Sequence, residues 1–189
     1  MLAHVLDRAA TRLRDHGVES PRFDAELLLA HLLGTNRAAI LAHPDRSLSP
    51  ELDARFRNLV ARRADREPLA YLLGHREFYG LDFLVDPRVL IPRPETEHLV
   101  EEALRLASRL PPSLRIADVG TGSGAIAVAL AVHLPQALVY ALDASAEALA
   151  VAAANAQRHG VAGRIRCLAG DLLTPLPEAV DLIVANLPY

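Results

Sequence analysis

Four consecutive residues, Asn186-Leu187-Pro188-Tyr189, are of types that could grip a planar NH₂ group. An asparagine side-chain carbonyl can accept one N–H of an amine or amide, and the main-chain carbonyl of Leu187 can accept the other. These bonds would favour a pyramidal nitrogen with a free lone pair, and the Tyr189 ring could pack on the positive charge that develops. The same residues also fit an ordinary turn after a strand, because Asn-x-Pro is common turn chemistry.

A glycine-rich turn, Gly120-Thr121-Gly122-Ser123-Gly124, precedes this segment in the chain and could hold a nucleotide-like cofactor. Its glycines let the chain reverse tightly and let a ligand approach the backbone without meeting a Cβ atom. A helix that begins near Ser123 would point its amide N–H groups at the same place. Asp143 ends the next predicted strand, where an acid accepts hydrogen bonds from ribose hydroxyls. The pattern also fits a nicotinamide-binding turn, or a tight turn and a helix-capping Asp with no ligand.

Asp118 helps to separate the two cofactors. An acid shortly before the first glycine of Gly-x-Gly-x-Gly is typical of S-adenosylmethionine sites, whereas a pyrophosphate would gain nothing from a carboxylate so close to it. Asp171 follows a third predicted strand, where methyltransferases carry an acid or amide that meets the adenine amino group, although an Asp also suits a plain turn. The expected cofactor is S-adenosylmethionine, and the residues expected to bind it are Gly120, Thr121, Gly122, Ser123, Gly124, Asp143, Asp171, Leu172 and Asn186.

An alternation of apolar strands and helices should bring these groups together. It indicates an α/β fold with a parallel, Rossmann-like sheet and right-handed crossovers. In such sheets ligands bind at the carboxyl ends of the strands, where the glycine turn, Asp143 and Asn186 all lie. Strands are expected at 115–119, 138–142, 164–168 and 181–185, and helices at 123–132 and 146–159.

The earlier part of the chain has a different pattern. Apolar residues recur at helical spacing from Leu2 onward, and Ser20-Pro21 and Ser49-Pro50 are caps followed by proline at the first helical position. An aromatic, β-prone stretch about Gly80 then predicts a short hairpin. The expected organisation is an all-α domain at 1–74, a hairpin and proline-rich connector at 75–94, and a cofactor-binding domain at 95–189.

Composition narrows the class of protein. Half of the 189 residues are hydrophobic (51%), which supplies a packed core, and the net charge of −3 argues against a nucleic-acid partner. The longest apolar stretch, residues 125–132, is too short to span a bilayer, so no membrane partner is expected. The eight histidines show no metal-ligand spacing, so no metal is expected. The single cysteine, Cys167, fits a reducing compartment and, in an apolar strand, a small core residue. The N-terminal residues lack a signal-peptide pattern, so a cytoplasmic protein is expected.

Taken together, these motifs resemble the HemK/PrmC family. Its members are S-adenosylmethionine-dependent methyltransferases that modify the glutamine amide in the Gly-Gly-Gln motif of class 1 peptide chain release factors. The proline-rich connector is the most family-specific piece, and the resemblance covers nearly the whole chain. It is carried by Phe78-Tyr79-Gly80, Ile91-Pro92-Arg93-Pro94-Glu95-Thr96-Glu97, Asp118 to Ile126 and Asn186 to Tyr189.

The resemblance implies a role for each motif. The glycine turn and Asp143 would line the cofactor, Asp171 and Leu172 would flank adenine, and Asn186 to Tyr189 would act as the catalytic residues that bind the glutamine amide. The helical region would contact the release factor.

Two departures from the family pattern bear on activity. The family has Asn-Pro-Pro-Tyr, so Leu187 stands in place of a proline; its carbonyl survives, but the fixed φ is lost and a weaker grip is expected. A complete class I methyltransferase sheet also has three further strands, so the sheet is expected to be incomplete, with strand 181–185 as an unpaired apolar edge. On this basis the chain is expected to be a fragment that binds cofactor but transfers methyl groups poorly.

Two other functions fit part of the pattern. Methylation of adenine N6 in DNA or RNA uses the same tetrapeptide, but it calls for a basic channel, and residues 1–74 carry 11 Arg against 10 acids. A non-catalytic binding module that keeps the docking domain is the third possibility.

Overall fold

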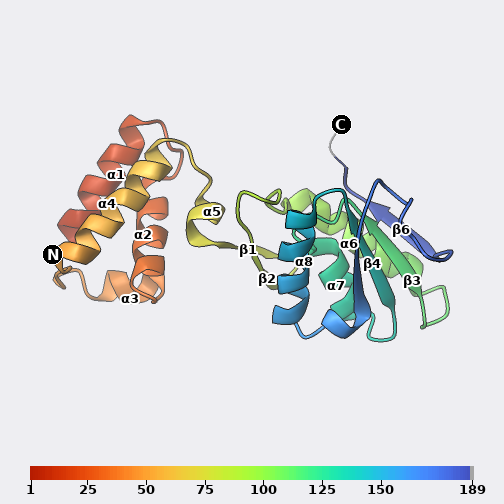
Figure 1. Ribbon diagram of the computed structural model, residues 1–189. Helices are drawn as coiled ribbons and strands as arrows, with labels where there is room; N and C mark the ends of the chain where they lie inside the picture. The colour runs from red at the N-terminus through yellow and green to blue at the C-terminus, as the bar shows by residue number, and fades with distance from the viewer. Residues whose placement is uncertain (188–189) are drawn as a thin grey trace. The chain divides into compact units, whose positions relative to one another are not determined.

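The computed structural model describes residues 1–187, and the chain divides into two compact units, Met1–Leu73 and Gly74–Tyr189 (Figure 1). The first unit is helical and the second contains the β-structure, as the change of pattern along the sequence predicts. In the described part of the chain, no helix is both long enough and apolar enough to cross a membrane.

The helical unit is built on an apolar core to which all five of its described helices contribute buried side chains. Among them are Leu13, Leu28 and Phe56, each at most 1% exposed. Two helices begin at the predicted prolines; the Ser49 side chain caps the second by accepting from the N–H of Leu52 at 3.2 Å. The helices of residues 1–73 are α1 (Leu2–Asp15), α2 (Pro21–Leu32), α3 (Arg37–Ala42), α4 (Pro50–Ala64) and α5 (Leu69–Leu73).

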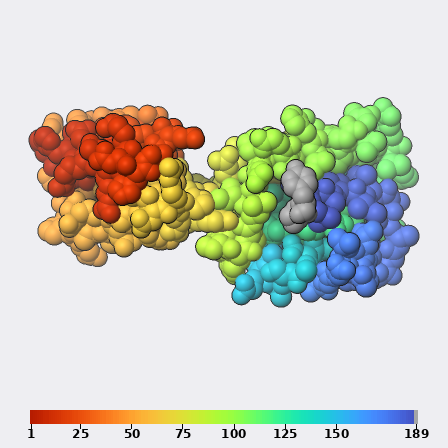
Figure 2. All heavy atoms as spheres, turned by 90° about the horizontal axis from the view of Figure 1, so that it is seen from above, coloured from red at the N-terminus to blue at the C-terminus, as the bar shows by residue number. Residues whose placement is uncertain are grey.

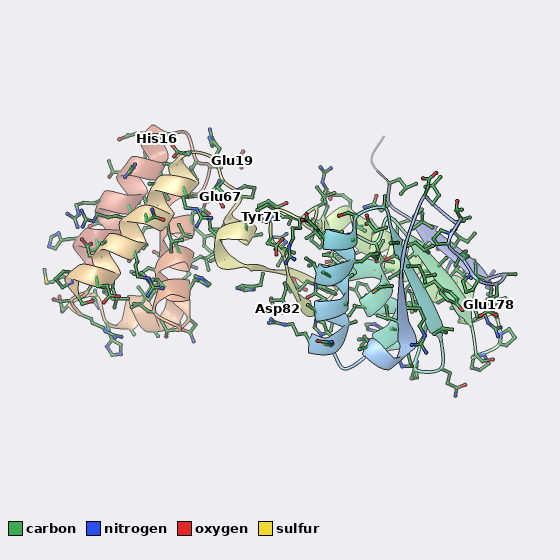
Figure 3. All side chains as sticks on the ribbon, viewed as in Figure 1. His16, Glu19, Glu67, Tyr71, Asp82 and Glu178 are labelled. Atoms are coloured by element: carbon green, nitrogen blue, oxygen red, sulfur yellow. The ribbon has the colours of Figure 1, made fainter. Side chains whose placement is uncertain are left out.

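The second unit opens with the predicted hairpin, in which β1 (His75–Phe78) pairs antiparallel with β2 (Leu81–Leu84). Its turn places Tyr79 and Gly80 at φ values of 52° and 72°, the left-handed geometry of tight hairpins. Asp82 on β2 points toward the end of α8 (Ala146–Arg158), where it pairs with Arg158 (Figure 3). The hairpin is thereby fixed to the sheet domain.

The described sheet has four parallel strands in the order β5-β4-β3-β6. The predicted strands and crossover helices are confirmed to within about two residues at each end. The elements are β3 (Arg115–Val119), α7 (Ala125–His133), β4 (Leu138–Asp143), α8, η2 (Ala162–Arg164), β5 (Ile165–Ala169) and β6 (Leu182–Ala185), preceded by η1 (Pro94–Thr96) and α6 (Glu97–Ala107).

Helices α6, α7 and α8 pack on one face of this sheet (Figure 1). Fully buried Ile116 and Val139 face these helices, and α7 is buried nearly all round. The opposite face carries a smaller cluster around Tyr140 and Leu142, which contacts Leu176 from the segment before β6. The α/β fold predicted from the sequence is therefore confirmed.

The edges of the sheet correct one expectation. Cys167 was expected to be a small core residue, but it is exposed because β5 is the outermost strand on its side. At the other edge, β6 pairs only with β3 among the described strands, and Ile183 is 51% exposed. Apolar strands are fully buried only in the middle of the sheet, where neighbours cover them on both sides.

Candidate active site

The glycine turn is fastened to the end of β4. The N–H groups of Gly120 and Thr121 both donate to the carbonyl of Leu142 at 2.9 Å. The N–H of Gly122 donates to Oδ2 of Asp143 at 2.9 Å, and Oδ1 of the same carboxylate accepts from Ser145. Asp143 thus shapes the turn and the start of α8. An ionised carboxylate has about four lone-pair positions, so it retains capacity for ribose hydroxyls.

Positive φ angles explain the glycines of this turn. Gly120, Gly122 and Gly124 have φ values of 71°, 55° and 78°, which residues with a Cβ atom rarely adopt. At Gly124 a Cβ atom would also lie 3.0 Å from the Cβ of Ala152 on α8. The third glycine therefore serves close packing between α7 and α8.

Asn155 holds the glycine turn and the hairpin together. Its buried side-chain amide donates to the carbonyls of Ser123 and Leu84 at 2.8 and 3.0 Å, and its Oδ1 accepts from the N–H of Leu84 at 2.7 Å. All three hydrogen bonds of this side chain are with backbone groups, in the hairpin strand and in the glycine turn. Sequence patterns did not identify this residue, because an Asn in an Ala-rich helix carries no local signal.

A cavity of about 460 Å³, here termed the glycine-turn cavity, opens at the carboxyl ends of β3, β4, β5 and β6. It brings together six of the residues predicted to bind cofactor: Gly120, Gly122, Asp143, Asp171, Leu172 and Asn186. The loop after the hairpin contributes Arg88, Val89 and Leu90, which no motif in the sequence indicated. Thr121 and Ser123 instead line a smaller adjoining cavity of about 60 Å³, and Gly124 packs on α8.

After β5, the wall of the glycine-turn cavity is formed by two exposed residues, Asp171 and Leu172. Leu172 has φ of 46° and is 52% exposed, an unfavourable combination for an apolar side chain. The Asp171 carboxylate beside it accepts no hydrogen bond from the described residues. A flat ring with an exocyclic amino group would cover the first and donate to the second, so the pair fits an adenine.

Asp118 lies under the turn rather than in the cavity. It is 1% exposed, and its Oδ2 accepts from the Thr121 hydroxyl at 2.6 Å and from the N–H of Ala127 at 3.1 Å. Burial raises the pKa of Asp118 to about 6, against the smaller lowering effect of those two hydrogen bonds. Its Oδ1 is buried and has no partner among the described residues. Asp118, the acid that favours S-adenosylmethionine over a dinucleotide in the sequence, therefore supports the glycine turn from beneath.

Asn186 follows β6 and faces the cavities. Its Nδ2 donates to the hydroxyl of Thr96 at 2.9 Å, across 90 residues of sequence. The two side chains also line a third cavity of about 730 Å³, here termed the connector cavity, whose walls include Leu90, Arg93 and Leu99. In the space-filling view onto this end of the sheet, yellow-green atoms of the segment near residue 90 lie close to the dark blue end of β6 (Figure 2). Asn186 thus lines both the glycine-turn cavity and the connector cavity.

Leu187 lies directly over the glycine turn. A Cβ atom at Gly120 would be 2.7 Å from the Cδ2 of Leu187, so the leucine side chain fills the space above that glycine. Leu187 lines both the glycine-turn cavity and the connector cavity. Pro188 and Tyr189, the other two residues of the predicted catalytic tetrapeptide, lie outside the described residues.

These features suit a nucleoside-bearing cofactor on one side of Asn186 and a planar substrate on the other. Small-molecule sites commonly enclose several hundred cubic ångströms, and the glycine-turn cavity, at about 460 Å³, is of that size. Glycine backbone without Cβ atoms forms part of its floor, and Asp143 lies at the ribose position of such folds. The residues fit S-adenosylmethionine.

Comparisons with known proteins cover both units. Residues 4–74 match the family model of the PrmC N-terminal domain, and residues 98–189 match that of the methyltransferase small domain. The release factor glutamine methyltransferase of Bordetella pertussis is 53% identical over 94% of this chain, and that of Koribacter versatilis is 45% identical over 100% of this chain. This chain spans 64% and 67% of those two proteins, respectively.

Among solved structures, the ribosomal protein L11 methylase of Lactobacillus delbrueckii subsp. bulgaricus is 36% identical and superposes with a TM-score of 0.46. The superposition covers 55% of this chain and 51% of that one.

Proposed function

Because the chain belongs to the release factor glutamine methyltransferase family, we propose that it transfers a methyl group from S-adenosylmethionine to a glutamine side-chain amide of class 1 peptide chain release factors. The acceptor would be the glutamine of their Gly-Gly-Gln motif. The observation that supports the proposal is the position of Asn186, whose side chain lines both a cofactor-sized cavity and a second cavity. This is the geometry that a transfer between two ligands requires.

Cofactor binding would depend on backbone and carboxylates. The glycine turn would contact the amino-acid part, Asp143 would accept from the ribose hydroxyls, and Asp171 with Leu172 would hold the adenine. When bound, S-adenosylmethionine would supply an electrophilic methyl group on a sulfonium, with the neutral thioether as the leaving group. No strong base is needed before that step, because the electrophile is strong and positioning lowers most of the barrier.

The chain would prepare the glutamine nitrogen as an acceptor. The Asn186 Oδ1 and the Leu187 main-chain carbonyl would each accept one N–H of the glutamine amide, which holds the NH₂ group and opposes its conjugation with the carbonyl. Pro188 would restrict the preceding residue to extended geometry, and Tyr189 would pack on the planar amide. After transfer the nitrogen loses its proton to solvent.

The helical unit is the proposed docking domain for the release factor. Its match to the PrmC N-terminal domain over residues 4–74 supports a role separate from the chemistry. We place the reaction in the cytoplasm, where release factors act. The segment 75–94 would belong with the cofactor-binding domain 95–189, since Asn155 and α8 hold the hairpin.

Label transfer tests this function. The protein is incubated with methyl-labelled S-adenosylmethionine and, in separate reactions, a release factor, its variant with the Gly-Gly-Gln glutamine changed to alanine, and duplex DNA. Label should appear on the intact release factor alone. Calorimetry with the cofactor measures binding independently of transfer.

The alternative functions predict different outcomes. Label on DNA adenine would replace the proposal with a nucleic-acid methyltransferase. Cofactor binding without label on any acceptor would indicate a non-catalytic module. Equal label on the release factor and its glutamine variant would show that the acceptor is another residue.

A further inference from the structure

Among the described residues, Thr96 is the side chain that forms a hydrogen bond with the Asn186 amide. Its hydroxyl accepts from Nδ2 of Asn186 at 2.9 Å, and the threonine is only 9% exposed. The two side chains share both the connector cavity and the small cavity beside the glycine turn. A buried hydroxyl therefore touches the group that is proposed to grip the substrate, from the side away from the glycine-turn cavity.

This contact engages the nitrogen end of the Asn186 amide. An asparagine amide carries two donors at nitrogen and an acceptor at oxygen, and the two ends look alike in shape. With Nδ2 engaged by Thr96, Oδ1 accepts no hydrogen bond from the described residues and is available to a ligand. A flipped amide would present N–H groups to the N–H groups of a substrate amide, a repulsive arrangement.

Thr96 is itself held firmly. It ends the short helix η1, which starts at Pro94, and its N–H donates to the carbonyl of Arg93 at 3.0 Å. The next residue, Glu97, accepts from the N–H of Tyr79 in the hairpin turn at 3.0 Å. From there α6 continues with Val100 fully buried against the sheet. A hydroxyl on such a braced segment can fix the rotamer of a more exposed side chain.

We propose that Thr96 is a positioning residue, which locks the Asn186 amide with its carbonyl toward the substrate. The inference rests on the proposed function for the role of Asn186 and extends it to the proline-rich connector. The connector would then contribute to catalysis, because it carries the Thr96 hydroxyl that orients the Asn186 amide at the end of β6.

The test replaces the hydroxyl without changing the volume. Thr96→Val should lower kcat for glutamine methylation about tenfold, the effect of one lost hydrogen bond. Cofactor affinity and KM should change less than about twofold, because the amide still occupies its site. Thr96→Ser keeps the hydroxyl and should stay within about threefold of the parent kcat, and Thr11→Val on an exposed face of α1 is the matched control.

A spectroscopic readout separates this inference from the proposed function. In a ¹⁵N–¹H spectrum the Asn186 side-chain NH₂ pair, assigned by its loss in Asn186→Asp, should move and exchange faster in Thr96→Val, while backbone signals remain. Unchanged side-chain signals, or an equal kcat, would overturn the positioning role. A parent protein that methylates no glutamine would instead overturn the proposed function, whichever way the Asn186 signals behave.

Discussion

The two units each bury a carboxylate, Glu26 and Asp118, but their surroundings shift the two pKa values in opposite directions. Glu26 in the helical unit has a side chain 4% exposed and is paired with both Arg22 and Arg37. Burial opposes its ionisation, but hydrogen bonds from Arg37 and Arg22 outweigh burial and lower the pKa. Asp118 in the sheet unit is buried without a cation, and its pKa is raised to about 6.

The same contrast extends to their surroundings. The helical unit also pairs buried Asp24 with Arg63 at 2.8 Å, so its own arginines satisfy its internal charge. The sheet unit leaves acceptors open at the strand ends, at Asp171 and at Oδ1 of Asn186. A closed set of ion pairs stabilises the fold, whereas acceptors left open around a cavity are available to a ligand. Acceptors without a hydrogen-bond donor among the described residues therefore indicate the candidate site as clearly as the sequence motifs do.

The largest expected effect concerns Asn186, the open acceptor that is proposed to bind the substrate amide. Asn186→Ala should lower the rate of methyl transfer by roughly 10²–10³, the range for removing one preorganised polar group from an active site. Cofactor affinity should fall far less. Gln136→Ala, an amide removed from an exposed turn, is the control. Single-turnover label transfer measures the effect, and a loss below tenfold would show that Asn186 does not grip the acceptor.

The next largest effect is the loss of unfolding free energy on replacing a glycine in each unit, measured by chemical denaturation. Gly34 follows α2 at φ of 60°, and a Cβ atom added there would meet nothing within 4 Å, so Gly34→Ala should cost about 1–2 kcal/mol of unfolding free energy from backbone strain alone. Gly124→Ala adds a clash with Ala152 and should cost about 2–4 kcal/mol. Equal costs at the two sites would mean that α7 and α8 can separate without penalty.

A third prediction uses the opposite pKa shifts. Asp118 has an ordinary pKa of 3.8 when unfolded and about 6 when folded, so between those values the folded state holds a proton that the unfolded state has lost. The unfolding free energy of the sheet unit should therefore fall as pH rises through that window, by on the order of 2–3 kcal/mol, and level off above it.

Glu26 should behave in the reverse sense. Because its folded pKa is lowered below 4.5, its stabilisation is present above pH 4.5 and is lost as pH falls through the lower value. Denaturation followed by amide signals of β3 and of α2 reports the two units separately. Asp118→Asn should remove the slope in β3, and Glu26→Gln should remove the acid loss in α2. Parallel pH profiles for the two units would contradict both assignments.

The smallest effect concerns Leu187. Leu187→Pro should raise the rate of methyl transfer about two- to fivefold, since proline restricts the backbone of the gripping carbonyl before the substrate arrives. Leu187→Ala removes the same contact with Gly120 without fixing φ and is the matched control. If alanine raises the rate as much as proline, then the leucine side chain, rather than backbone freedom, limits the reaction.

Local patterns in the sequence were sufficient for most of the secondary structure. The strand predicted at 115–119 has those bounds, and the helices α2 and α4 begin at their predicted prolines. Ser20, predicted as a cap like Ser49, makes no side-chain cap bond. The turn glycines, Asp143 and Asn186 were also found by type and spacing, because tight turns and strand ends have strict local requirements.

The sequence by itself determined the periodicity of the elements, the prolines and glycines that bound them, and the polar residues at the strand ends. Only the tertiary structure decided that Thr96 holds Asn186, that Asn155 joins the hairpin to the glycine turn, and that Cys167 is exposed. Propensity and spacing act over a few residues, whereas these contacts depend on strand order, which places β6 beside β3 and leaves β5 at an edge. Strand order follows from how all the apolar faces pack at once, and no local segment contains that information.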